Sequence, residues 1–120
     1  MPAALAFVID ALLVLVFVLI GRATHAENPL LGALITYWPF LAGLVAGWLV
    51  GRAWRRPLSV VRTGLVVWTA TVVIGLLLRV LSDQGVQWSF VIVTSVVLGV
   101  FLLGWRAVAS LVRSRRAARP

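Results

Sequence analysis

The stretch that decides the fold is LLGALITYWPFLAGLVAGWLVG, residues 30–51. It carries no charge, and the uncharged run that contains it extends over the 24 residues from 28 to 51. About 20 mainly apolar residues in a helix are enough to cross a bilayer. We therefore expect residues 30–51 to form a transmembrane helix, which contains Pro39, a residue that cannot donate a backbone hydrogen bond.

Small side chains line one side of this predicted helix, because their spacing repeats with the helical turn. In membrane proteins such a stripe lets the backbone of a second helix approach closely. We expect the stripe to pack against another helix, either within the chain or in another copy, and this helix to be the most enclosed of the bundle. The stripe comprises Gly32, Thr36, Gly43, Gly47 and Gly51.

Three further apolar runs, residues 3–21, 60–81 and 87–109, are each long enough to cross a bilayer. The chain of 120 residues is 62% hydrophobic and only 12% charged, whereas soluble domains are about 25% charged. We therefore predict an all-α, polytopic membrane protein, a single domain with four transmembrane helices in an up-and-down bundle. Residues 110–120 are predicted to form a basic tail that is mobile or lies on the lipid surface.

The first run, residues 3–21, has an alternative interpretation as a secretory signal peptide. Such a peptide needs a basic segment ahead of an uncharged apolar core. Here no arginine precedes Arg22, and Asp10 lies within the apolar run. We therefore interpret residues 3–21 as a retained transmembrane helix.

Arginine supplies all 11 basic residues, and the net charge is +8. With four spans, eight arginines fall on the side of both termini, and only Arg22 and Arg79 fall on the other. Cytoplasmic loops gather arginine, so we predict that both termini are cytoplasmic. The lack of lysine beside abundant alanine, glycine, valine and arginine indicates a G+C-rich prokaryotic genome, and hence the prokaryotic cytoplasmic membrane.

Because these arginines flank apolar runs, the lipid bilayer and its anionic headgroups are a better partner for them than nucleic acid. We predict no binding of nucleic acid. The arginines predicted to contact lipid headgroups are Arg52, Arg55, Arg56, Arg113, Arg115 and Arg116.

Two charged residues lie well inside the predicted helices. Asp10 is about seven residues from the inner end of the first run, or about 10 Å at 1.5 Å per residue, and Arg106 lies at a similar depth in the last run. A lone charge within a bilayer costs at least about 2.5–3.5 kcal/mol, so such residues usually pair or face the bundle interior. We predict an intramembrane ion pair between Asp10 and Arg106, which either locks the bundle or relays a proton or an ion.

A polar cluster is predicted at the opposite, outer end, above an aromatic floor of Tyr37 and Trp38. The planar fork of arginine suits carboxylate and phosphate and stacks on aromatic rings. Such a cluster can hold an anion, a lipid headgroup or a quinone-like ring. The alternative is that its arginines only extend to the headgroup level to keep their charge in water. The cluster comprises Arg22, His25, Glu27, Arg79 and Asp83.

The sequence offers little for catalysis. It contains no nucleophile–base set, phosphate-binding loop, dinucleotide fingerprint or metal-ligand cluster, and three acids with one histidine leave little for acid–base chemistry. His25 alone cannot assemble a zinc site, which uses three or four protein ligands. We predict no enzymatic activity and no metal site, and the sequence identifies no cofactor.

Short phrases distributed along the chain carry a family resemblance: Asp10, Gly21-Arg22, Thr24-His25, Trp38-Pro39-Phe40, Gly47-Trp48, Trp68, Leu78-Arg79 and Leu103-Gly104-Trp105-Arg106. In these phrases the chain resembles a prokaryotic membrane protein family of unknown function, of the DUF3054 type. The resemblance covers nearly the whole chain and implies four transmembrane helices, but no activity and no functional residues. The small multidrug-resistance exporters and the dual-topology fluoride channels are similar in size only, because their local motifs differ.

Two functions from different classes fit these observations. The first, which the sequence favours, is a small transporter- or channel-like protein that binds a polar or anionic solute. The second is an accessory or structural subunit that binds lipid and a larger membrane complex. In both cases we expect a homo-oligomer or a place in a larger complex. A water-accessible cavity that reaches Asp10 favours the first function, and a solid core favours the second.

Overall fold

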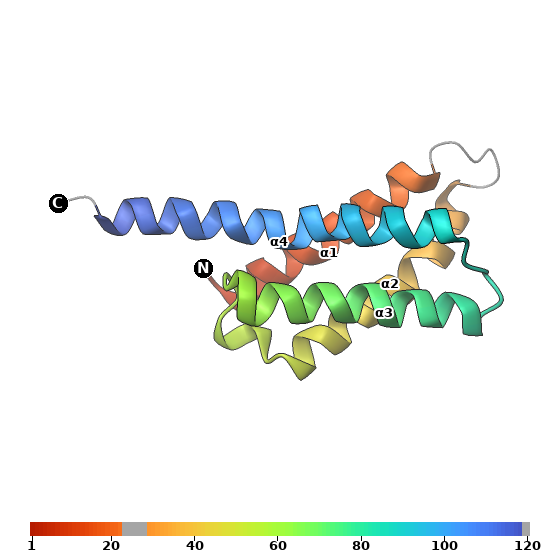
Figure 1. Cartoon of the computed structure of the whole chain (residues 1–120), viewed down its shortest axis with the longest axis horizontal. Helices are drawn as coiled ribbons and strands as arrows, with labels where there is room; N and C mark the ends of the chain where they lie inside the picture. The colour runs from red at the N-terminus through yellow and green to blue at the C-terminus, as the bar shows by residue number, and fades with distance from the viewer. Residues whose placement is uncertain (23–28, 119–120) are drawn as a thin grey trace.

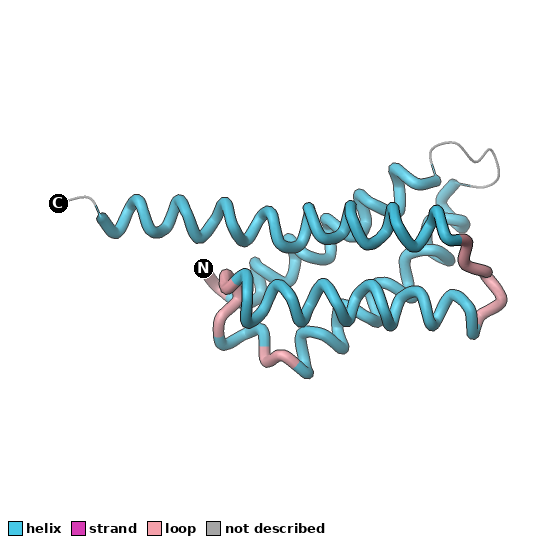
Figure 2. Tube along the Cα trace, viewed as in Figure 1, coloured by secondary structure: helices cyan, strands magenta, loops and turns pink. Residues whose placement is uncertain are grey.

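The computed structural model describes residues 1–22 and 29–118, and within them every regular element is helical (Figure 1, Figure 2). The predicted all-α fold class is confirmed. All four long helices are apolar enough to cross a membrane, with mean hydropathy between 1.7 and 3.0. The elements are α1 (Ala3–Arg22), α2 (Pro29–Val50), the 3-10 turn η1 (Ala53–Arg55), the π-helical turn η2 (Val60–Gly64), α3 (Leu65–Leu81) and α4 (Trp88–Ala118).

The helix α2 is the most enclosed of the four, as predicted. Within the span Leu31–Val50, 44% of the residues are buried, compared with 22–28% in the other three spans. It is continuous through Pro39, which is itself buried.

The small-residue stripe of α2 lies directly against α3. A Cβ on Gly43 would lie 2.9 Å from the Ala70 carbonyl oxygen, and one on Gly47 would lie 2.9 Å from the Ala70 Cβ. Gly51 approaches Val66 in the same way. Of the remaining stripe members, Thr36 is buried and Gly32 is half-buried. The stripe is thus used within the chain, and Gly43 and Gly47 bring the two helix backbones together.

The helix α4 continues well past its expected end at residue 109. Residues 110–118 are helical and extend in line with α4 beyond the rest of the bundle (Figure 1), so the prediction of a separate tail was wrong for them. Between Gly104 and Arg119 there is neither glycine nor proline, and alanine, leucine and arginine are strong helix formers. A helix of 31 residues is about 46 Å long, which exceeds the roughly 30 Å of a bilayer core.

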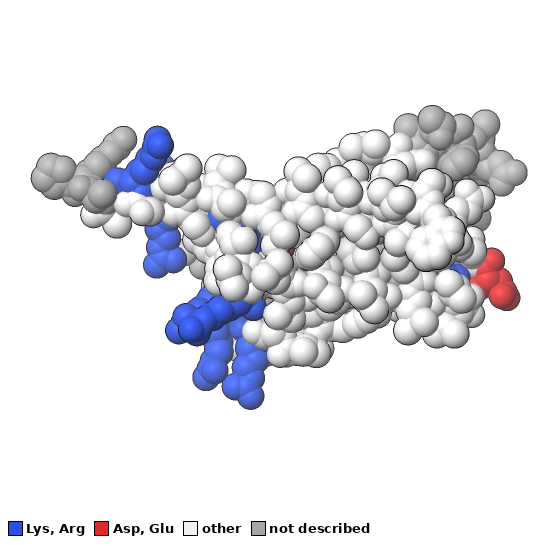
Figure 3. Space-filling model, viewed as in Figure 1, with Lys and Arg blue, Asp and Glu red and all other residues white. Residues whose placement is uncertain are grey.

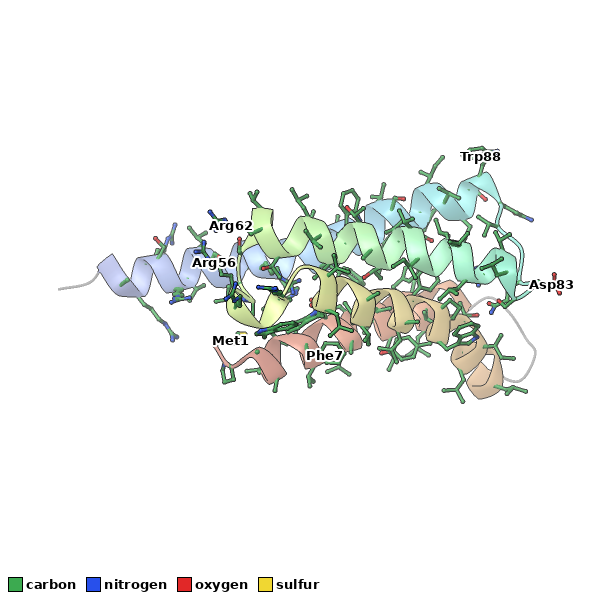
Figure 4. All side chains as sticks on the ribbon, turned by 90° about the horizontal axis from the view of Figure 1, so that it is seen from below. Met1, Phe7, Arg56, Arg62, Asp83 and Trp88 are labelled. Carbon is green, nitrogen blue, oxygen red and sulfur yellow. The ribbon has the colours of Figure 1, made fainter. Side chains whose placement is uncertain are left out.

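The up-and-down path places the N-terminus, the linker of residues 51–64 and the end of α4 at one end of the molecule (Figure 1). The arginines gather at this end, and the acidic side chain visible in Figure 3 lies at the other. This acid belongs to Asp83, in the turn after α3 (Figure 4). We call the two ends the arginine-rich end and the Asp83 end. The charge separation predicted from the sequence is therefore present along the long axis of the bundle.

The contact between α2 and α3 predicts the effect of a single added methyl group. Gly43→Ala should lower the free energy of unfolding by about 1–3 kcal/mol, because the new Cβ would meet backbone atoms of α3. Gly104→Ala is the matched control, since nothing lies within 4 Å of its Cβ position. It should be neutral or stabilising by up to about 1 kcal/mol. Unfolding in mixed detergent micelles, followed by helical circular dichroism, measures both; equal effects would contradict the close contact.

Candidate functional site

An ion pair between the first and last helices lies in the middle of the bundle. The two terminal nitrogens of Arg106 on α4 donate to the two carboxylate oxygens of Asp10 on α1, over 2.7 Å and 2.6 Å. Both side chains are 0% exposed. This is the bidentate arrangement in which a guanidinium binds a carboxylate most strongly. The structure therefore brings together the two residues that the sequence analysis paired by depth.

Two tryptophans complete the surroundings of the carboxylate. The indole N–H of Trp48 on α2 donates to one oxygen of Asp10 over 2.8 Å, and the indole N–H of Trp105 on α4 donates to the other over 2.8 Å. Each oxygen thus accepts two hydrogen bonds. An ionised carboxylate has about four acceptor positions, so this arrangement leaves none for a water molecule or a solute.

The guanidinium of Arg106 also binds the backbone. Its Nε donates to the Pro57 carbonyl over 2.8 Å, and one terminal nitrogen donates to the Leu102 carbonyl over 3.0 Å. The guanidinium carbon lies 4.9 Å from the centre of the Trp105 ring. Arg106 therefore joins α1, α4 and the linker of residues 51–64 at one point. We call Asp10, Arg106, Trp48 and Trp105 the central cluster.

Three members of this cluster, Asp10, Trp48 and Arg106, each belong to a row of buried residues that are four positions apart in the sequence. A spacing of four keeps side chains on one helix face, and each of three helices presents such a face to the interior. Its members are at most 8% exposed. Gly64 leaves room for the stem of Arg106, whose Cδ lies 3.4 Å from the position of a Cβ on Gly64. The faces are Ala6, Asp10, Val14 and Val18 on α1, Thr36, Phe40, Leu44 and Trp48 on α2, and Thr94, Leu98, Leu102 and Arg106 on α4.

Sequence reasoning missed the two tryptophan donors and the Pro57 carbonyl. Trp48 and Trp105 enter the sequence analysis only through the family resemblance, and neither is given a polar partner there. A usable signal was present, because a buried indole N–H usually needs an acceptor and Asp10 is the one acid within the apolar runs. The Pro57 carbonyl had no such signal, since a loop carbonyl is placed only by the path of the folded chain.

At the Asp83 end, the structure describes the side chains of two members of the predicted polar cluster, Arg79 and Asp83. The side chain of Arg79 makes several contacts. Its guanidinium lies 4.5 Å from the centre of the Phe90 ring, and it donates to the Gly85 carbonyl and to the Gln84 side chain. Asp83 is exposed in the turn, with a left-handed φ of 60°. His25, Glu27 and the side chain of Arg22 lie outside the described residues.

A cavity of about 330 Å³ lies beside Arg79, and its floor differs from the predicted one. Tyr37 and Trp38 do not line it: the hydroxyl of Tyr37 donates to the Ala11 carbonyl over 2.8 Å, and Trp38 is 45% exposed on the outer surface. Successive helical residues point in different directions, so the inward residues of α2 here are Thr36 and Phe40. The lining consists of Phe17, Val18, Gly21, Thr36, Arg79, Ser89, Phe90 and Val93.

Phe17 and Phe90 take the place of that floor, and Phe40 packs against both of them. The rings of Phe17, Phe40 and Phe90 come from three different helices and lie 5.8–6.3 Å apart between centres. Gly75 on α3 makes room for them, since a Cβ there would overlap the Phe40 ring. Arg79 thus stands over a phenylalanine cluster.

The predicted headgroup arginines are all exposed at the arginine-rich end. Arg52, Arg55 and Arg56 lie in or beside η1, and the other three lie on the last turns of α4. Among residues 1–22 and 29–118, no group of three His, Cys, Asp or Glu side chains could hold a metal ion.

Comparison with known proteins gives one family. The sequence model of the family described as "Protein of unknown function (DUF3054)" matches residues 7–109, which include every member of the central cluster. No curated protein and no solved structure matches the chain.

The central cluster predicts strong coupling between its two charges. Asp10→Leu and Arg106→Leu should each cost about 3–5 kcal/mol, because each leaves the other charge buried without its partner. The double variant should cost clearly less than the sum of the single variants, since both charges are then removed. Unfolding free energies in mixed micelles give the double-mutant cycle; additive costs would contradict the coupling.

The indole donors predict a smaller effect that is specific to a tryptophan whose N–H binds Asp10. Trp105→Phe keeps an aromatic ring but removes the N–H that binds Asp10, and should cost about 1.5–3 kcal/mol. Trp88→Phe is the matched control, because Trp88 is 83% exposed at the start of α4. It should change the unfolding free energy by less than about 0.5 kcal/mol. Equal losses in thermal unfolding would show that the indole N–H contributes nothing.

Proposed function

We propose that this chain, which belongs to the DUF3054 family, acts as an accessory or structural subunit of the prokaryotic cytoplasmic membrane. It crosses the bilayer four times with both termini in the cytoplasm, binds lipid and joins either copies of itself or a larger membrane complex. It performs no catalysis of its own. The observation that carries this proposal is the closed central cluster around Asp10.

A transport residue must exchange its ligand with water during each cycle. The Asp10 side chain is 0% exposed, and four donors occupy its two oxygens. Hydrogen bonds to charged groups contribute about 1.5–3 kcal/mol each. Opening this site would break several of them, whereas conformations that exchange readily differ by only a few kcal/mol. The central cluster therefore supports a lock that fixes the helices, and not a relay.

The outward faces of the helices support contact with lipid and with partner helices. Even α2 has more than half of its span unburied, and α4 has 22% buried. Large apolar side chains such as Ile20, Val100 and Leu49 are more than 60% exposed. In a bilayer such faces are covered by acyl chains or by other helices. A bundle that is closed inside and apolar outside suits a subunit whose work is done at its surface.

The cavity beside Arg79 favours a second candidate function, the small transporter- or channel-like protein. Among the described residues, the cavity lining includes one guanidinium, that of Arg79 over the Phe90 ring, which fits an anion or an amphipathic anion. In this candidate the solute would use Arg79 and leave the central cluster closed.

Flux measurements in liposomes test the proposal. Purified chain, reconstituted with a potassium gradient and a pH-sensitive dye, should give proton and anion fluxes equal to those of protein-free liposomes. Asp10→Asn and its control Asp83→Asn, which changes an exposed acid, should give the same result. Proton flux that Asp10→Asn alone abolishes would overturn the proposal. Anion flux that Arg79→Gln abolishes and Arg62→Gln leaves intact would establish the second candidate.

Native mass spectrometry of the chain extracted from its own membrane gives the complementary readout. We expect an assembly heavier than one chain, with bound lipid. A lipid-free monomer that also carries flux would contradict an accessory role.

A further inference from the structure

We propose that the arginine-rich end binds one anionic lipid whose headgroup carries two phosphates, with a phosphate in each of two adjoining hollows of the linker. This inference rests on the proposed membrane topology, which puts the end at a face of the bilayer. It names the lipid class recognised by those predicted headgroup arginines that line the hollows, a subset from which Arg115 and Arg116 are absent.

The two hollows lie side by side because they share arginines. The larger has a volume of about 400 Å³ and the smaller about 210 Å³. Arg55 and Arg56 line both of them, and Figure 4 shows Arg56 and Arg62 together at the end where Met1 lies. The other polar side chains are Ser59, Ser110 and Arg113 in the larger hollow, and Arg52, Arg62 and Thr63 in the smaller.

The linker that carries the shared arginines is held at three consecutive carbonyls. The Thr63 hydroxyl donates to the Arg56 carbonyl over 2.5 Å. Arg106 donates to the Pro57 carbonyl over 2.8 Å, and the Ser110 hydroxyl donates to the Leu58 carbonyl over 2.8 Å. Within the linker, the backbone N–H of Arg62 also donates a hydrogen bond to the Ser59 hydroxyl over 3.1 Å. A backbone fixed in this way loses little conformational freedom when a ligand binds. The hollows are therefore built before the lipid arrives.

The charge at this end is uncompensated within the described residues. The two described acids are Asp10, which is bound in the central cluster, and Asp83, at the opposite end. Five arginines thus line the two hollows, and no described carboxylate lies on the surface at this end (Figure 3). Guanidinium groups bind phosphate oxygens in a planar, two-pronged arrangement. Two linked phosphates are the ligand that satisfies two arginine-lined hollows at once, because binding the first raises the effective concentration of the second.

Exposed apolar side chains next to the hollows point to a lipid as the source of these phosphates. Val50 is 79% exposed, Val61 is 70% exposed and Leu111 is 55% exposed. They lie on three different helical segments within a few residues of the lining arginines. Acyl chains would cover such side chains, whereas a free diphosphate or a nucleic acid has no group to place there.

The test compares two lipids and two double variants. The purified chain is titrated with cardiolipin, which has two phosphates, and with phosphatidylglycerol, which has one, at equal phosphate concentration, and binding is counted by native mass spectrometry. Wild type should bind cardiolipin at least about tenfold more tightly, a difference of about 1.4 kcal/mol. Arg55→Gln with Arg56→Gln should remove this preference. Arg115→Gln with Arg116→Gln removes the same charge from the end of α4, outside both hollows, and should keep it.

Three results would overturn the inference. One is equal affinity for the two lipids in the wild type. Another is an equal loss of the cardiolipin preference in the two double variants, because total charge alone would then determine the lipid preference. The third is displacement of cardiolipin by pyrophosphate or by a short oligonucleotide at matched phosphate, which would reveal a site for free anions or nucleic acid.

Ser110→Ala keeps the inference testable if the arginine variants fail to fold. This change leaves every charge in place and removes one carbonyl tether, so it should lower the cardiolipin preference by about threefold while phosphatidylglycerol binding stays constant. No change in preference would contradict the prebuilt linker. The liposome fluxes are independent of these titrations, so a failure here leaves the accessory role standing and a positive flux leaves the lipid site standing.

Discussion

The rest of the structure depends on the need to satisfy one buried pair of charges. Removing two ions from water costs several kcal/mol each, and their attraction offsets this only when the remaining donors and acceptors are also bound. Asp10 and Arg106 meet this requirement through the indoles of Trp48 and Trp105 and through the Pro57 carbonyl. The relative rotation of α1, α2 and α4 is therefore fixed by hydrogen bonds, in a bundle whose apolar contacts alone would allow neighbouring rotations.

The same pair connects the interior with the arginine-rich end. Arg106 binds Asp10 with its terminal nitrogens and the linker with its Nε, so the position of α1 and the shape of the linker are set by one side chain. The close contact of α2 with α3 at Gly43 and Gly47 forms the other rigid part of the molecule. At the Asp83 end, by contrast, a cavity remains between the helices. The central cluster thus fills the interior beside the linker, whereas the described helices leave a cavity between them at the Asp83 end.

The apolar runs were enough to predict four helices, because span length alone decides membrane helices. The glycine stripe and the depths of Asp10 and Arg106 were also readable, since both follow from position along a helix. The side-chain contacts that the sequence did not reveal depend on how each helix is rotated about its axis and on the path of the loops. Tyr37 and Trp38 point away from the cavity that they were expected to floor. The continuation of α4 to Ala118 was not predicted, because the expected helix was ended where the apolar run gives way to arginines.

The separation of Asp10 and Arg106 by 96 residues in the chain has a consequence for biosynthesis. At about 5–20 residues per second, the ribosome adds the arginine roughly 5–20 s after the aspartate. Throughout that interval the first helix carries a carboxylate whose cationic partner has not yet been made, at a cost of about 2.5–3.5 kcal/mol if it enters lipid. In the proposed membrane topology, α1 therefore reaches its final hydrogen-bonded position only after α4 has been made.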